Sequence, residues 1–196
     1  MINSSPIIKE NQIIPEHDEM LLKVNLKQLR LPTILAEFEK LAKEAAEENA
    51  AYSQYLLRLS ELEVATRTAN ALKNRIKQAA FPTHKDFDSY DFSAMPSLNK
   101  QKVLELARCE WLNKHENSCL IGNAGTGKTH LAIALGLAAC RQGCKVRFFT
   151  AASLVNRLEE ARKQYQLDKF LSQLDKADLL ICDEMGYLSF SRTGAE

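Results

Sequence analysis

A glycine-rich segment contains the side chains with the clearest chemistry in this sequence. Residues 122–129 read Gly-Asn-Ala-Gly-Thr-Gly-Lys-Thr, a complete G-x-x-x-x-G-K-[ST] phosphate-binding loop. Its glycines let the backbone curl so that successive N–H groups point at phosphate oxygens. Lys128 is expected to reach the β- and γ-phosphates of a nucleoside triphosphate, and the Thr129 hydroxyl to ligate Mg²⁺. The residues predicted to bind the nucleotide are Gly122, Asn123, Ala124, Gly125, Thr126, Gly127, Lys128 and Thr129.

Two acids at the end of an apolar run form the second candidate site. Residues 179–182 read Leu-Leu-Ile-Cys, and Asp183 and Glu184 follow directly. A carboxylate at the C-terminal end of a buried strand lies beside the phosphate loop in this kind of fold, so we expect Asp183 to orient Mg²⁺ through water. Glu184 is expected to polarise a water for attack on the γ-phosphate, with Lys128 as the second catalytic residue. The alternative for Glu184 is a solvated loop acid without a catalytic role.

The segments around these motifs have the patterns that such a site requires. Residues 118–121 predict a short buried strand, and residues 129–140 predict an Ala/Leu-rich helix. Two further strands are predicted at 145–149 and 178–184, with helical sequence from 152 to 174 between them. Strands that alternate with helices predict a three-layer α/β domain with a parallel sheet.

The sequence before these elements predicts a separate helical module. Residues 1–18 have no periodicity and predict a flexible tail. Apolar residues at helical spacing predict a small all-α module over residues 19–81, which ends at Phe81-Pro82. Residues 82–97 are rich in aromatic and acidic residues and predict a linker to a nucleotide-binding domain over residues 98–196.

The linker and the start of the second domain carry finer expectations. Tyr90 and Phe92 are expected to pack between the domains, or alternatively against the adenine of a nucleotide. Ser97 is expected to cap a helix over residues 98–113.

A run of basic residues without carboxylates lies near the end of the helical module. Between Val64 and Lys85 there is no acid, and a helical wheel places most of the cations on or beside one polar face. Such a face suits a DNA phosphate backbone, because each cation releases a condensed counterion. A solvated face, or one that docks on an acidic partner, remains the alternative. The residues predicted to contact DNA are Arg67, Lys73, Arg75 and Lys77.

Composition narrows the class of protein. The chain has 196 residues, of which 45% are hydrophobic and 26% charged, with a net charge of +1, as in soluble globular proteins. No apolar run approaches the ~18 residues of a membrane span. The N-terminus lacks the features of a secretory signal, so a cytoplasmic location is expected. The five cysteines form no CxxC pair, and we expect all of them to be reduced and structural.

The order of these features resembles the IstB family, which comprises the helper ATPases of a class of bacterial insertion sequences. IstB belongs with the DnaC-like helicase loaders among the AAA+ ATPases. The resemblance covers roughly residues 20–195. The segments that carry it are Leu29-Arg30-Leu31-Pro32, the Asp/Phe linker, Trp111-Leu112-Asn113-Lys114-His115-Glu116-Asn117, the phosphate loop and Ala138-Ala139-Cys140-Arg141-Gln142-Gly143.

The resemblance implies a function. Residues 122–129 would bind ATP, Asp183 would help to hold Mg²⁺, and Glu184 would support hydrolysis. Members of this family assemble with one another on DNA in an ATP-dependent way and direct a partner transposase. A DnaC-like helicase loader that binds a protein partner, and an inactive remnant, are the alternatives.

The end of the sequence departs from the family pattern. The chain ends at Glu196, whereas a full AAA+ core continues with further strands, a polar sensor residue, an arginine finger and a helical lid. The resemblance therefore predicts a P-loop NTPase (AAA+) sheet that is incomplete at the C-terminus. ATP turnover is expected to be impaired in consequence.

Overall fold

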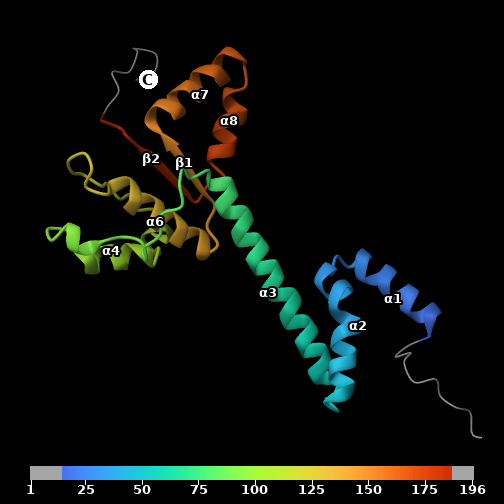
Figure 1. Cartoon of the computed structure of the whole chain (residues 1–196). Coiled ribbons are helices and arrows are strands. Elements are labelled where there is room, and N and C mark those ends of the chain that lie inside the picture. The colour runs from blue at the N-terminus through green and yellow to red at the C-terminus, as the bar shows by residue number, and fades with distance from the viewer. Residues whose placement is uncertain (1–14, 187–196) are drawn as a thin grey trace, which may run out of the picture. The chain divides into compact units, whose positions relative to one another are not determined.

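A computed structural model describes residues 15–186 of the chain (Figure 1). The chain divides into two compact units, Met1–Asn70 and Ala71–Glu196. Within the described residues the elements are α1 (Glu16–Gln28), α2 (Pro32–Glu47), α3 (Tyr52–Ala79), the 3₁₀ turn η1 (Phe92–Ala94), α4 (Lys100–Ala107), α5 (Glu110–Asn113), α6 (Lys128–Arg141), β1 (Val146–Thr150), α7 (Ala151–Lys163), α8 (Leu167–Leu174) and β2 (Leu179–Asp183).

The first unit is built from α1, α2 and the N-terminal part of α3. Each of these helices contributes one residue to a buried apolar cluster, namely Leu26, Phe38 and Leu59. The Tyr55 hydroxyl donates a hydrogen bond to the carbonyl of Phe38 at 3.0 Å. The sequence placed the end of this module at residue 81, but the compact unit ends at Asn70. The later turns of α3 belong to the second unit, because their apolar residues pack into its core.

A buried carboxylate on α3 replaces the missing cap of α2. The N-cap residue of α2, Leu31, has no side-chain oxygen, and Pro32 occupies the first helical position. The carboxylate of Glu63, which is 3% exposed, accepts hydrogen bonds from the N–H groups of Thr33 (2.9 Å) and Ile34 (3.1 Å). These are free donors of the first helical turn, and a negative charge there is favoured by the helix dipole.

The guanidinium of Arg67 completes this cap. Its Nε donates to Glu63 at 2.9 Å, and a terminal nitrogen donates to the carbonyl of Arg30. Burial raises the pKa of the Glu63 carboxyl, but the hydrogen bonds from Ile34, Thr33 and Arg67 outweigh burial and hold this pKa below its usual value. The cation therefore has a structural task in the first unit.

Replacing Glu63 by Gln is expected to lower the free energy of unfolding by about 1–3 kcal/mol, since a buried charge-assisted hydrogen-bond set loses its charge. Because the pKa of Glu63 is depressed on folding, its contribution is present above the unfolded pKa of about 4.3 and is lost as pH falls through the folded pKa. Urea unfolding followed by circular dichroism should therefore show a deficit at neutral pH that shrinks in acid. The matched control is Glu61→Gln, an exposed acid on the same helix. An equal loss in both variants would contradict this account.

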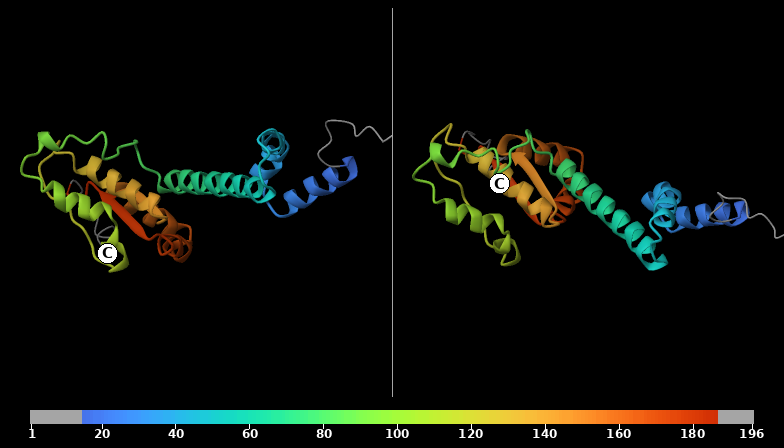
Figure 2. Two further views of the ribbon diagram at one scale, coloured as in Figure 1. Left: turned by 90° about the horizontal axis from the view of Figure 1, so that it is seen from below. Right: turned by 60° about the horizontal axis from the view of Figure 1, so that its bottom comes forward.

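The second unit contains the parallel α/β arrangement that the sequence predicts. Strands β1 and β2 pair in parallel, with Val146 opposite Leu179 and Thr150 opposite Asp183. Successive residues of a strand point to opposite faces of the sheet. Phe148 accordingly packs with residues of α6, whereas the ring of Phe149 contacts Phe170 of α8 at a centroid distance of 6.5 Å. The sheet therefore lies between α6 on one face and the α7–α8 segment on the other (Figure 2).

A glycine lets α6 approach the sheet closely. A Cβ atom at Gly136 would lie 2.7 Å from Ile181 of β2 and 2.8 Å from the ring of Phe81. At these distances any side chain at position 136 would displace Ile181 and Phe81, so glycine is what allows the close approach. The close approach fixes the helix that follows the phosphate loop against the strand that carries the acid pair.

The predicted strand at 118–121 was wrong. These residues are in no strand, Cys119 is exposed, and Ile121 is 91% exposed. A strand needs a neighbour to bond its N–H and C=O groups. The described sheet contains β1 and β2 alone, so residues 118–121 have no ladder partner within it.

Two predicted helices are each divided by a residue with a left-handed backbone. The helix expected over 98–113 begins after Asn99, which caps it in place of Ser97, and is interrupted at Cys109 (φ 60°). There the indole Nε1 of Trp111 donates a hydrogen bond to the Leu106 carbonyl at 2.9 Å. In a continuous helix this carbonyl would instead accept the backbone N–H four residues further along. The segment expected over 152–174 is interrupted at Tyr165 (φ 56°), between α7 and α8.

The structure also bears on the cysteines and on membrane insertion. All five cysteines are free thiols. Burial is the main cause that raises the pKa of the Cys140 and Cys109 thiols. Among residues 15–186, no group of three His, Cys, Asp or Glu side chains is placed to hold a metal ion. None of the described helices has the length and apolar character to cross a membrane.

Candidate nucleotide-binding site

The phosphate loop leads directly into the first turn of α6. Gly125 (φ 76°) and Gly127 (φ 80°) adopt left-handed backbone angles that favour glycine. Gly127 is the N-cap of α6, so the helix begins at Lys128. The free N–H groups and the positive end of the helix dipole make this terminus suited to an anion.

An aromatic residue of the preceding segment supports the loop. A Cβ atom at Gly127 would lie 3.1 Å from the Tyr90 ring. The Tyr90 ring also meets the His130 ring edge to face at a centroid distance of 5.0 Å. His130 Nε2 lies 2.8 Å from the carbonyl oxygen of Asp86, which ties the segment to α6. The Tyr90 ring thus packs on the loop glycine and also lines the cavity beside the loop, so its packing against an adenine stays a prediction.

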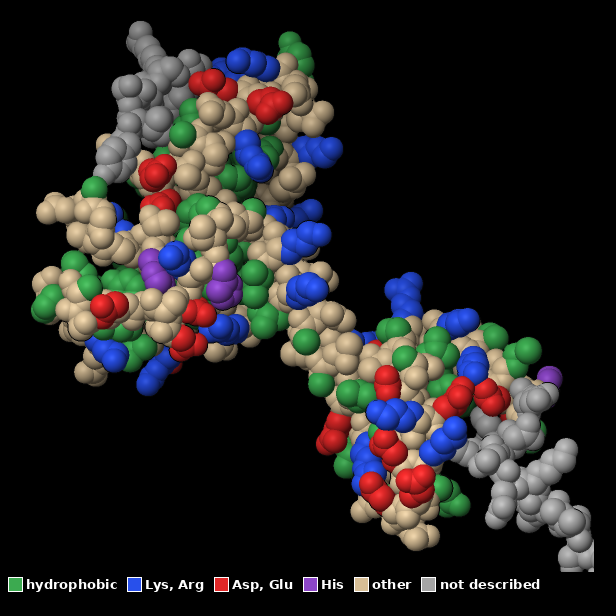
Figure 3. Space-filling model, in the orientation of Figure 1, with side chains coloured by type: hydrophobic (Ala, Val, Ile, Leu, Met, Phe, Trp, Pro, Cys, Tyr) green, Lys and Arg blue, Asp and Glu red, His purple; other side chains and the backbone are tan. Residues whose placement is uncertain are grey.

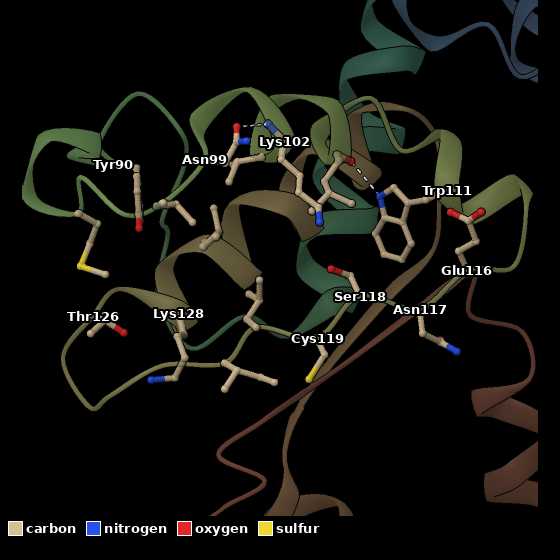
Figure 4. A pocket seen from close by; sticks show the side chains of 17 residues that line it. Tyr90, Asn99, Lys102, Trp111, Glu116, Asn117, Ser118, Cys119, Thr126 and Lys128 are labelled. Carbon is tan, nitrogen blue, oxygen red and sulfur yellow. Dashed lines mark hydrogen bonds between the residues drawn. The ribbon is translucent and has the colours of Figure 1, made fainter.

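Hydrogen bonds inside the loop fix its polar side chains. The Lys128 ammonium donates to the carbonyl of Asn123 at 2.6 Å, and the Thr126 hydroxyl donates to the same carbonyl at 2.8 Å. Figure 4 shows Lys128 and Thr126 at one end of the neighbouring cavity. The ammonium is therefore held within the loop, where it can neutralise a phosphate.

The structure brings Thr129 and Asp183 together, although they are far apart in the sequence. The Thr129 hydroxyl donates to Oδ2 of Asp183 at 2.6 Å. A hydroxyl and a carboxylate are oxygen donors of the kind that Mg²⁺ prefers. These two residues thus fit the ion that the loop motif implies.

Glu184 follows at the end of β2 with its side chain exposed. Its backbone is left-handed (φ 61°), and its N–H donates to Oδ1 of Asp183 at 3.0 Å. Both Asp183 oxygens therefore accept hydrogen bonds. Burial, and then the Asp183 charge, raise the pKa of the neighbouring Cys182 thiol, which keeps this thiol neutral beside the acid pair.

A cavity of about 510 Å³ adjoins the loop (Figure 4). This volume lies in the usual range for small-molecule sites. Its walls include apolar residues of α4 and of segment 118–121, and its polar lining includes Lys102, Ser118 and the loop residue Lys128. Asp183 and Glu184 are not among its lining residues. The cavity is placed to hold the nucleoside of a nucleotide whose phosphates lie on the loop.

The sequence motif did not indicate the cavity residues. Trp111, Lys102 and Ser118 line the cavity, and the sequence assigned none of them a role in binding. The bend after α4, which brings the indole back over the cavity, depends on a hydrogen bond to Leu106. No pattern in the sequence marks that contact.

The four cations predicted to contact DNA lie in different surroundings. Lys73 and Lys77 are exposed and one helical turn apart on α3. Arg67 is bound to Glu63 in the first unit. Arg75 is half-buried, and its Nε donates to the carbonyl of Cys140 at the end of α6 at 3.0 Å. Lys73 and Lys77 are therefore the two without a structural contact among the described residues.

The model of the family described as "IstB-like ATP binding protein" matches residues 24–196. A protein of Geobacillus stearothermophilus, named as an ATP-binding protein of insertion sequence IS5376, is 37% identical over 168 residues, which are 86% of this chain and 67% of that protein. One from Pseudomonas aeruginosa, named as an ATP-binding protein of insertion sequence IS21, is 35% identical over 174 residues, 89% of this chain and 66% of that protein. A relative from Sinorhizobium fredii, likewise named as an insertion sequence ATP-binding protein, is 36% identical over 88% of this chain and 58% of its own length. The chain thus spans about two thirds or less of the length of these relatives.

Proposed function

This chain belongs to the family of IstB-like ATP-binding proteins, and on that premise we propose that it binds ATP with Mg²⁺ and assists the transposition of DNA. The hydrogen bond between Thr129 and Asp183 is the observation that carries the proposal. It joins the phosphate loop to the acid pair, as a site for a metal–nucleotide complex requires. The names of the relatives connect such proteins with insertion sequences.

The proposal gives each residue of the site a role in ATP binding and hydrolysis. The loop N–H groups and Lys128 hold and orient the phosphates. Bound Mg²⁺ supplies charge neutralisation on the phosphate oxygens. Glu184 accepts the proton of an attacking water, since its exposed carboxylate follows directly after Asp183. We therefore propose that the chain hydrolyses ATP as well as binding it.

Partners are also part of the proposal. Duplex DNA would contact the exposed cations of α3 through its phosphates, and a transposase would be the protein that the complex directs. Copies of the chain would assemble on the DNA. The family resemblance supports these partners, and the exposed pair Lys73 and Lys77 supports the DNA contact.

The double variant Lys73→Gln/Lys77→Gln tests the DNA contact. It is expected to weaken binding to any duplex and to reduce the slope of log K against log salt by about 1.8, or 0.9 for each lost phosphate contact. The measurement is fluorescence anisotropy of a labelled duplex over a series of salt concentrations, with ATP and Mg²⁺ present. Arg67 is left unchanged because its substitution would disturb the cap of α2.

The control is Lys100→Gln/Lys114→Gln, which removes the same charge from exposed positions on α4 and after α5. An unchanged slope in the α3 variant would remove these lysines from the DNA contact. If the unaltered chain bound no duplex while a replicative helicase co-purified with it, a helicase loader would replace the transposition helper.

A further inference from the structure

A second cavity, of about 260 Å³, lies in the Ala71–Glu196 unit and is lined by cations. Four basic residues surround it, together with amide side chains from α3 and α8. The cations are Arg75, Lys145, Arg147 and Lys176. They come from three separate segments, namely α3, the start of β1 and the turn between α8 and β2, so the fold and not a run in the sequence brings them together.

Backbone carbonyls hold the two guanidinium groups in place. Arg75 Nε donates to the Cys140 carbonyl at 3.0 Å, and Arg147 donates from a terminal nitrogen to the carbonyl of Gln78. Each arginine has five N–H donors, so most of them remain available. A guanidinium fixed in this way loses little side-chain entropy when it binds a phosphate bidentately.

Acidic side chains do not neutralise this cluster. None of its four cations forms an ion pair with a carboxylate of residues 15–186. Asp178 lies at the start of β2, and its carboxylate accepts the backbone N–H of Lys145 at 2.7 Å. Figure 3 shows a row of Lys and Arg side chains on the side of this unit where the C-terminal part of α3 lies, with few acids between them.

The cluster lies at the other end of the sheet from the nucleotide site. Lys145 and Arg147 are at the start of β1, whereas Thr150 at its end pairs with Asp183. Four steps of about 3.3 Å along the strand separate the two ends by roughly 13 Å. A ligand at the cluster therefore does not compete for the phosphate loop.

We propose that the cavity lined by Arg75, Lys145, Arg147 and Lys176 binds a phosphodiester group of duplex DNA. This inference rests on the proposed function, since it takes DNA as a partner, and it adds a second contact to that of Lys73 and Lys77. Arg75 lies on α3 between Lys73 and Lys77 in the sequence, on about the opposite side of the helix from both lysines. The cluster is therefore a DNA contact of its own, and it can be occupied while ATP occupies its own site.

The test uses Lys145→Gln/Lys176→Gln in the full chain, because both lysines are exposed and neither side chain bonds to another described residue. Anisotropy with a labelled duplex is measured as a function of salt, beside Lys73→Gln/Lys77→Gln and the charge-matched control Lys100→Gln/Lys114→Gln. The salt slope is expected to fall by about 1.8 in the cluster variant and by about 3.6 when both active pairs are replaced. Binding of ATP, measured by calorimetry, should be equal in all variants and shows that they are folded.

The possible outcomes separate the two proposals. A normal slope in the cluster variant, together with a reduced slope in the α3 variant, would overturn the cavity as a DNA site and leave the proposed function standing. A reduced slope in the cluster variant alone would support the cavity and remove the α3 lysines. Failure of the unaltered chain to bind duplex DNA would overturn both proposals.

Discussion

Replacing Lys128 by Ala is expected to weaken ATP and ADP binding by roughly ten- to hundredfold. Hydrogen bonds to charged groups contribute about 1.5–3 kcal/mol, and each 1.4 kcal/mol is a factor of ten in affinity. The variant removes the ammonium that is held at the Asn123 carbonyl but keeps the loop N–H groups and the start of α6. Isothermal titration calorimetry with each nucleotide measures the effect.

The control for this prediction is Lys114→Ala, which removes an exposed lysine from the same unit. It should bind both nucleotides as the unaltered chain does. Equal affinity in the Lys128 variant and this control would show that the loop lysine does not bind phosphate.

Replacing Asp183 by Asn is expected to abolish most of the gain in ATP affinity that Mg²⁺ provides. The amide oxygen can still accept the hydrogen bond from Thr129, while the negative charge and the acceptor for the Glu184 N–H are lost. A hard divalent cation binds a neutral amide less well than a carboxylate. Affinity in Mg²⁺ should fall by about tenfold, an effect of about 1.4 kcal/mol, while affinity in EDTA should be unchanged.

The Asp183 prediction has a control variant and two outcomes that would contradict it. Asp175→Asn, a substitution at the exposed C-cap of α8, should leave the Mg²⁺ dependence as it is. An Asp183 variant that loses affinity equally with and without Mg²⁺ would show a structural effect, and one that loses none would exclude the carboxylate from metal binding.

The parts of the fold that were predictable from the sequence are those with a local pattern. Both strands of the sheet and the helix after the phosphate loop were predicted to within a residue or two, because apolar runs and a glycine-rich motif identify them. The parallel α/β arrangement followed from the alternation of strand and helix. Residues 118–121 are apolar enough to form a strand, but pairing depends on a neighbour that their own sequence does not specify.

The contacts that support the site depend on residues far apart in the sequence. Tyr90 is an aromatic residue in a linker, and only the folded chain shows that its ring packs on Gly127. Glu63 resembles any helix-surface acid, yet its carboxylate caps a helix that begins about thirty residues earlier. Arg75 belongs to a basic run by sequence, while its guanidinium bonds to α6. The residue types near one position in the sequence do not show which distant residue its side chain will contact.

The most direct test of ATP binding at this site is amide hydrogen exchange with and without ATP and Mg²⁺. If the account is correct, ATP slows exchange at residues 122–131, where the loop N–H groups contact phosphate, and around residues 183–184, where the metal ligand lies. The Lys128→Ala variant should show neither effect at the same ATP concentration. Protection confined to other segments, or protection at the loop that persists in the Lys128 variant, would contradict the assignment of this loop as the ATP site.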